Sequence, residues 1–232
     1  MQQRNNNFLL NRLEPDVLNW ITSQLLLVDL PRGQVLAEPD QQIDKVYFPH
    51  SGVISCVVEL RSGDAIETGM IGKDGAFGAG HAFDGRVSMN RAVMQASGVA
   101  SVISSDRLEG VANEFPALKK LLLDYEHFLL TQVQQTAACN AVHDVQARTC
   151  KWLLRMHELA GPELLLTQEF LAQMMGVQRT SVTGAASELQ EAGLITYARG
   201  HIRINEIGRV RQRACECDED IRSHYRRIMK TN

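Results

Sequence analysis

The clearest pattern of apolar and polar positions lies between Leu166 and Ile204. Apolar residues recur there at helical spacing in two successive sets, which are Phe170, Leu171, Met174 and Met175, and then Val182, Ala185, Ala186 and Leu189. Spacing of this kind gives each helix one buried face. The pattern therefore predicts two helices joined by a tight turn, with a short β-hairpin after them.

Residues at the ends of these segments agree with that prediction. Thr167 precedes the first helix, where its hydroxyl can accept hydrogen bonds from free backbone amides. Gly176 stands where the helix would end in a left-handed conformation, which glycine adopts without steric cost. Segments 195–197 and 202–204 would form the strands of the hairpin, with 199–201 as its tip. Together they predict a winged helix-turn-helix, whose second helix enters the DNA major groove.

Polar side chains of this segment are suited to contact DNA. Five are predicted to be exposed near the start of the second helix, and they are Gln178, Arg179, Thr180, Ser181 and Thr183. Arg199 and His201 flank the glycine at the hairpin tip. Side chains of these types reach base edges and phosphates. The alternative interpretation is a helical hairpin and a β-hairpin of an unrelated fold.

Residues 25–107 show the pattern of short β-strands and not of helices. Short apolar runs, such as 46–48, 53–58 and 99–103, are separated by turns rich in glycine, proline, aspartate and serine. Many short strands with glycine turns favour a closed β-barrel or a β-roll.

A long amphipathic helix should follow, with Pro116 at its start, where the missing amide costs nothing. Its apolar stripe includes a heptad-like series, which is Leu118, Leu122, Tyr125, Leu129, Gln132 and Thr136. A heptad series is typical of helices that pair with a second copy. We therefore expect Leu118, Leu122, Tyr125 and Leu129 to form a dimerisation seam. Packing of this stripe inside the same chain is the alternative.

Asp144 can cap the next helix, so His143 and Asp144 form a candidate hinge. With 232 residues, the chain is long enough for two small domains. We expect a sensing β-domain with short N-terminal helices over 1–114, a dimerisation helix over 115–143, and a winged helix-turn-helix with a helical tail over 144–232.

Charge supports this division. The whole chain has a net charge of −3, which by itself would argue against nucleic acid. Residues 1–143 hold 11 Lys and Arg against 16 Asp and Glu, whereas residues 144–213 hold 9 against 7. The basic excess thus lies where we predict DNA contact, and it would supply the salt-dependent part of the affinity.

No apolar run approaches the roughly 20 residues of a membrane helix, and the first residues do not resemble a secretory signal. We expect a cytoplasmic protein without membrane contact. Five scattered cysteines suit a reducing compartment. Cys215 and Cys217 are the only close pair among them, and such a pair alone is a weak metal or redox signal. No metal site is predicted from it.

Residues 166–204 resemble the DNA-binding domain of the Crp/Fnr family of bacterial transcription regulators, and the similarity continues through residues 139–154. A more diffuse similarity covers residues 26–106. The resemblance implies an α+β protein with an N-terminal double-stranded β-roll of cyclic-nucleotide-binding type, a long dimerisation helix and a C-terminal winged helix-turn-helix. It also implies a homodimer bound to double-stranded DNA, with RNA polymerase as a further partner.

The family's cyclic-nucleotide cassette would correspond to Gly72, Lys73, Asp74 and Arg91 here. The family's Gly-Glu is replaced by Gly-Lys, and Ala92 follows the arginine where a hydroxyl is expected. Both changes remove contacts to the nucleotide, so a cyclic nucleotide is doubtful and no cofactor is predicted. Members with an iron–sulfur centre use N-terminal cysteines, which the first 55 residues lack. A degenerate sensor, or another ligand, is the preferred interpretation.

The resemblance makes Arg179 the base-reading arginine of the second helix. The family's usual Glu and Arg are replaced by Thr180 and Gly184, so the target should differ from the family's usual palindrome. We predict a regulator that binds a pseudo-palindromic operator as a homodimer. The rival hypothesis is a sensor that signals by protein–protein contact. No clustered nucleophile and base is recognisable, and an enzyme is therefore not expected.

Overall fold

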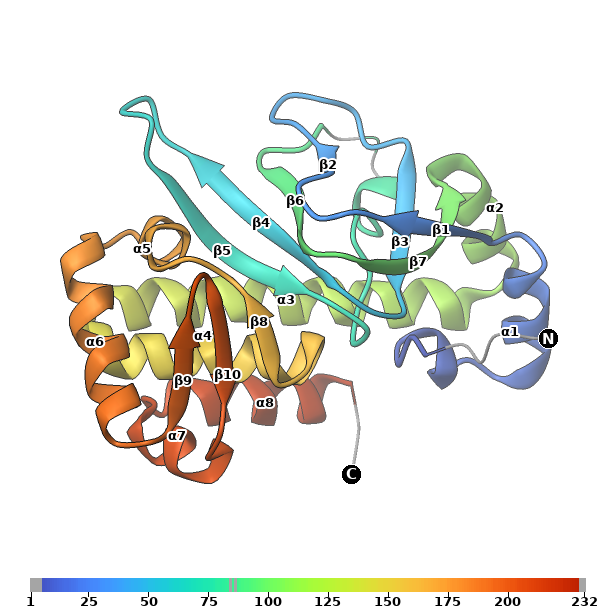
Figure 1. Cartoon of the computed structure of the whole chain (residues 1–232). Coiled ribbons are helices and arrows are strands. Elements are labelled where there is room, and N and C mark those ends of the chain that lie inside the picture. Colours follow the sequence, from blue (N-terminus) through green and yellow to red (C-terminus); the bar gives the residue numbers. More distant parts are fainter. Residues whose placement is uncertain (1–5, 84, 86, 230–232) are drawn as a thin grey trace.

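The computed structural model describes residues 6–83, 85 and 87–229, and it confirms the α+β class. Two antiparallel sheets form the N-terminal domain. One sheet has the order β1 (Leu26–Leu30), β7 (Gly98–Ser104), β3 (Lys45–Pro49). The other has the order β2 (Val35–Ala37), β6 (Arg91–Ala96), β4 (Val53–Glu59), β5 (Ala65–Ile71). Figure 1 shows both sheets above the long helix α3 (Pro116–Val142).

Short helices flank this β-domain. They are η1 (Leu10–Arg12), α1 (Pro15–Thr22), η2 (His81–Phe83) and α2 (Ser105–Glu114). After α3, the C-terminal part consists of α4 (Val145–Ala160), β8 (Glu163–Leu165), α5 (Gln168–Met175), α6 (Arg179–Glu191), β9 (Ile195–Ala198), β10 (His201–Ile204), α7 (Ile207–Arg213) and α8 (Cys217–Ile228). Among the described residues, no helix is both long and apolar enough to cross a bilayer.

The predicted ends of the C-terminal helices are confirmed. Asp144 Oδ1 accepts a hydrogen bond from the Ala147 amide at 2.8 Å and caps α4. Thr167 Oγ1 accepts from the Phe170 amide at 3.1 Å and caps α5. Gly176 ends α5 with φ 62° and ψ 43°, the left-handed conformation that glycine favours.

The dimerisation seam was placed on the wrong face of α3. Leu118, Leu122 and Tyr125 are fully buried in the core of their own chain, and Leu129 packs against that core. Burying Leu118, Leu122 and Tyr125 under the β-domain stabilises the fold of a single chain and leaves these three no surface for a partner, whereas Leu129 is half-buried. The intramolecular alternative is therefore the correct one for this stripe.

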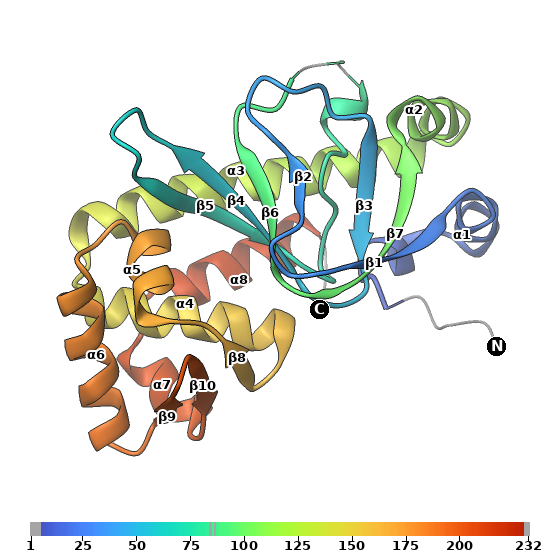
Figure 2. The ribbon, with the colours of Figure 1, turned by 45° about the horizontal axis from the view of Figure 1, so that its top comes forward.

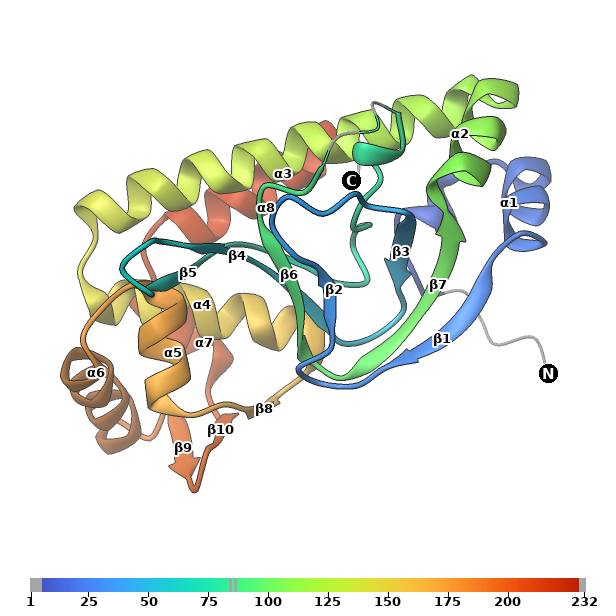
Figure 3. The ribbon, with the colours of Figure 1, turned by 90° about the horizontal axis from the view of Figure 1, so that it is seen from above.

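The tail helix α8 completes the same core rather than belonging to the C-terminal part alone. It lies alongside α3 in Figure 3 and contacts it. Tyr225 meets Phe128 edge to face, with ring centroids 5.0 Å apart, and its hydroxyl donates to the Asp74 carbonyl oxygen at 2.8 Å. Met229 is buried in the core of the β-domain.

Gly75 allows α3 to approach the β-domain closely, and its replacement should destabilise the fold. An alanine Cβ at this position would lie 1.8 Å from Tyr125 Oη, inside a packed core. We expect Gly75→Ala to lower the free energy of unfolding by about 3 kcal/mol. Thermal and urea unfolding followed by circular dichroism measure it.

Gly110→Ala is the matched control, since Gly110 lies within α2 and its Cβ would meet nothing within 4 Å. That change should raise stability by up to about 1 kcal/mol through helix propensity. Equal effects of the two substitutions would contradict the close approach.

Candidate DNA-binding surface and domain interface

The helix-turn-helix presents most of the predicted DNA-contacting residues to solvent. Gln178, Arg179, Thr180 and Ser181 are exposed at the N-terminal end of α6, while Val182 and Leu189 on its opposite face are fully buried. The Arg179 guanidinium lies 3.3 Å from the Glu169 carboxylate, and both side chains are mostly exposed. An exposed pair of this kind contributes little to stability, so Arg179 can exchange it for another anion.

Thr183 has a different environment from the other four. Its hydroxyl lies 2.7 Å from Gln168 Oε1 and 3.0 Å from the Arg179 carbonyl oxygen, and its side chain is half-buried. Thr183 therefore joins α6 to α5, and its hydroxyl is less accessible than those of Thr180 and Ser181.

The wing is a tight hairpin between β9 and β10. Arg199 and Gly200 at its tip have positive φ angles of 49° and 79°, as two-residue hairpin turns that follow the strand twist require. Arg199 and His201 are both exposed. The strand β8, which no sequence pattern indicated, pairs with β10 and makes the wing a three-stranded sheet.

The predicted effector residues are not gathered at one site. Lys73 and Asp74 line a cavity of about 320 Å³ between β5, α3, α4 and α8. The Gly72 amide donates to Asp74 Oδ1 at 3.3 Å, which closes the turn. Arg91 instead lies at the start of β6, where its guanidinium pairs with Glu38 at 3.4 Å and Glu59 at 2.8 Å.

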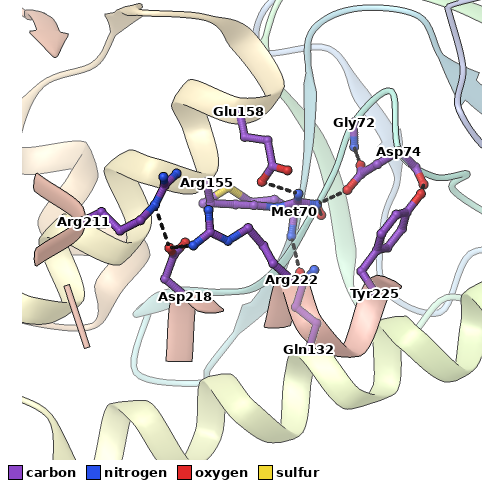
Figure 4. Close-up of polar contacts among 10 residues, drawn as sticks. All are labelled: Met70, Gly72, Asp74, Gln132, Arg155, Glu158, Arg211, Asp218, Arg222 and Tyr225. Carbon is purple, nitrogen blue, oxygen red and sulfur yellow. Dashed lines mark hydrogen bonds and ion pairs between the residues drawn. The ribbon is translucent and has the colours of Figure 1, made fainter. Parts of the chain in front are cut away.

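Asp74 makes an ion pair across the domain interface. Arg155 Nη2 of α4 lies 2.6 Å from Asp74 Oδ2, and both side chains are largely buried. The same nitrogen donates to the Met70 carbonyl oxygen at 3.3 Å, while Glu158 lies on the other side of the guanidinium (Figure 4). The turn after β5 therefore contacts α4, the first helix of the C-terminal part, directly.

Glu67 makes a second contact across the interface. Trp152 Nε1 of α4 donates to Glu67 Oε1 at 2.8 Å, and the Ser55 hydroxyl donates to the other carboxylate oxygen. Burial raises the pKa of Glu67 to about 7, although the hydrogen bonds from Ser55 and Trp152 oppose this shift. A carboxyl that changes charge near neutral pH thus sits between the two domains.

The helix-turn-helix also rests on the β-domain. Met174 of α5 is buried against Val57 and Ala65, which belong to β4 and β5. The Arg32 guanidinium lies over the Phe170 ring, 5.9 Å from its centroid. Figure 2 shows α5 beneath the β4–β5 hairpin and α6 on the outer side. The helix α5 is thereby held against the β-domain, while the outer surface of α6 stays exposed to solvent.

A cluster of cysteine and histidine side chains forms where α3 ends. Cys139 of α3 and His143, directly after that helix, meet Cys215 and Cys217, and the potential ligand atoms of the four all lie within 4.8 Å of one another. The neighbouring Cys215 thiol, which lies within hydrogen-bond distance, lowers the pKa of Cys139. The sequence does not indicate the cluster, because 76 positions separate Cys139 from Cys215.

Known proteins match this architecture. Residues 147–213 match the Crp-like helix-turn-helix domain family. A CRP-like cAMP-activated global transcriptional regulator of Mycobacterium tuberculosis is 25% identical over 210 residues, which cover 87% of this chain and 94% of that protein.

Two solved structures show the same fold. FixK2 from Bradyrhizobium japonicum has a TM-score of 0.70 and 14% identity, over 82% of this chain and 98% of that one. A Crp/Fnr-family regulator from Eubacterium rectale has a TM-score of 0.69 and 16% identity, over 90% and 99%. The chain is a transcription regulator of the Crp/Fnr type.

The buried Glu67 of this Crp/Fnr-type regulator makes its stability depend on pH. The pKa is about 7 in the folded protein and about 4.3 in an unfolded chain, so the folded state holds the proton more tightly. The contribution of Glu67 to the free energy of unfolding is therefore fully present below the unfolded pKa, and about 4 kcal/mol of it is lost as pH rises from the unfolded pKa to the folded pKa of about 7. Glu67→Gln should remove this loss.

Urea unfolding of the wild type and of Glu67→Gln between pH 5 and pH 8 tests this prediction. The variant should gain stability relative to the wild type as pH rises, whereas Glu109→Gln, at an exposed site on α2, should follow the wild type. A difference that stays constant over this range would show that Glu67 does not titrate there.

Proposed function

We propose that this regulator binds a pseudo-palindromic operator as a homodimer, with the N-terminal end of α6 in the major groove and the wing tip on the phosphate backbone. The observation that carries the proposal is the exposed set Gln178, Arg179, Thr180 and Ser181 on a helix whose other face is buried. Arginine contacts guanine through two hydrogen bonds, and short polar side chains contact either bases or phosphates.

The outer face of α3 supports dimerisation. Its exposed positions recur at alternating steps of four and three, and they are Leu123, His127, Leu130, Gln134, Ala137 and Ala141. Leu123 is 49% and Leu130 57% exposed in the single chain. A heptad stripe with leucines at one end and alanines at the other suits a parallel two-helix seam. The twofold axis of this seam would relate the two α6 helices of the dimer. They would then reach half-sites about one turn of the DNA helix apart.

We propose that signals reach the DNA-binding part through the Asp74–Arg155 and Glu67–Trp152 contacts. The mycobacterial relative is named as cAMP-activated. In this chain Arg91 is paired with two glutamates, and Lys73 lies over the Phe8 ring, 5.4 Å from its centroid. These pairings support a sensor that is degenerate or takes a ligand other than cAMP. Protein–protein signalling without DNA is the rival function.

Arg179→Ala should weaken selective DNA binding. Loss of a two-bond arginine contact costs about 1–3 kcal/mol, so affinity for a fragment selected by the wild type from a random library should fall about 10- to 100-fold. Fluorescence anisotropy titrations at several salt concentrations, with a scrambled fragment alongside, measure this.

Arg107→Ala, at an exposed site on α2, is the control and should bind as the wild type does. Equal weakening on both fragments would make Arg179 a phosphate contact. A wild type without salt-dependent DNA affinity would favour the rival function.

Leu130→Lys should break the homodimer. Each buried leucine contributes about 1.5–3 kcal/mol, and the substitution removes two per dimer while it adds two charges. The dissociation constant should rise at least about 100-fold, as measured by analytical ultracentrifugation over a dilution series. Leu60→Lys, at a leucine that is 49% exposed after β4, is the control. An unchanged dimer in Leu130→Lys would place the dimer interface elsewhere.

A further inference from the structure

The cluster at the end of α3 has the donor types of a structural zinc site. Cys139 lies on the last turn of α3, and His143 is the residue directly after that helix. Cys215 and Cys217 lie at the junction of α7 and α8 and face them. The cysteines of the cluster are buried and the histidine is half-buried.

Distances within the cluster match tetrahedral coordination. Cys139 Sγ and Cys215 Sγ are 3.6 Å apart, and Cys217 Sγ is 3.6 Å from His143 Nδ1. Bonds of about 2.3 Å to sulfur and 2.0–2.1 Å to nitrogen, at tetrahedral angles, separate two sulfurs by about 3.8 Å and a sulfur from a nitrogen by about 3.5 Å. All four ligand atoms lie within 4.8 Å of one another, so movements of up to about 1 Å would let them surround one ion.

Neighbouring groups complete the environment of such a site. His143 Nε2 lies 3.2 Å from Glu216 Oε1, so the imidazole that offers Nδ1 to a metal can donate its other N–H to a carboxylate. Metal-binding histidines almost always have a partner of this kind, which fixes their tautomer. Gln135 Nε2 donates to Cys217 Sγ at 3.2 Å, as suits a sulfur that carries negative charge.

We propose that Cys139, His143, Cys215 and Cys217 bind one Zn²⁺ ion as a closed structural site. Three thiolates and an imidazole are a typical zinc donor set, and they leave no open position for catalysis. A disulfide between Cys139 and Cys215 is the competing outcome, but its bond of about 2.05 Å would use two of the four groups and leave the histidine without a role.

The position of the site indicates what the ion would do. His143 is the residue after α3, and Asp144 caps α4, so this joint connects the long helix to the DNA-binding part. Cys215 and Cys217 follow α7, the last helix of that part. An ion bound to side chains from the end of α3 and from the junction of α7 and α8 would hold the joint at His143 and Asp144 in one geometry. The proposal concerns metal binding and stands independently of DNA binding.

Cobalt and zinc titrations of the reduced, metal-free full-length protein test the proposal. We expect one Co²⁺ per chain, with the visible absorption of tetrahedral cobalt and the charge-transfer absorption of thiolate ligands, and its displacement by Zn²⁺. Zinc should also raise the melting temperature, because a ligand that binds only the folded state stabilises it. Amides of residues 141–144 should exchange hydrogen more slowly with zinc bound.

Variants separate this cluster from the other cysteines. Cys217→Ser and His143→Gln should abolish the tetrahedral cobalt spectrum. Glu216→Gln keeps all four ligands and should lower zinc affinity about 10- to 100-fold. Cys56→Ser and Cys150→Ala, which change free cysteines outside the cluster, should bind as the wild type does.

Octahedral cobalt absorption in the wild type, or an equal loss of binding in the Cys56 and Cys150 variants, would overturn the proposal. A Cys139–Cys215 disulfide that persists in reductant and excludes metal, detected by mass spectrometry, would overturn it as well. The spectrum of the wild type decides the question even where a variant fails to fold.

Discussion

The buried ion pair between Asp74 and Arg155 is the contact on which the arrangement of the two halves depends. Either charge alone would be costly to remove from water, and breaking a buried pair typically costs about 3–5 kcal/mol. Asp74 can make this contact because it lies in the turn after β5, and Arg155 because it lies on the inner face of α4. The same turn receives the Tyr225 hydroxyl from α8. One short loop of the β-domain therefore contacts two helices of the C-terminal half.

The helix α3 serves two surfaces at once. Its inner stripe, with Leu118 and Tyr125, closes the core of the β-domain, while its outer stripe, with Leu123 and Leu130, remains open to solvent. Both stripes have apolar residues at heptad spacing, so periodicity could not distinguish them. The more apolar stripe suggests a dimer seam, but in the structure its large side chains fill the core of their own chain. Only the position of the β-domain decides between the two faces.

Features set by neighbouring residues could be predicted from the sequence, and features set by distant residues could not. Thr167, Gly176 and Asp144 act within a few positions of themselves, and each was placed correctly. The exposed face of α6 followed from helical spacing in the same way. The Arg155 contact joins residues 81 positions apart, and the cysteine cluster joins residues more than 70 apart. A pair such as Cys215 and Cys217 has little meaning until the fold brings Cys139 and His143 to it.

The helix α8 follows the helix-turn-helix in the sequence, so it is synthesised long after the β-domain on which it packs. The helix α8 and the residue after it supply Tyr225 and Met229 to the core of the β-domain. During synthesis the β-domain therefore cannot complete its core until α8 has been made, and Phe128 and the turn at Asp74 stay uncovered until then. A chain shortened before Cys217 would retain the whole helix-turn-helix and its wing. Its defect would arise instead in the β-domain, which lies far from the cut in the sequence.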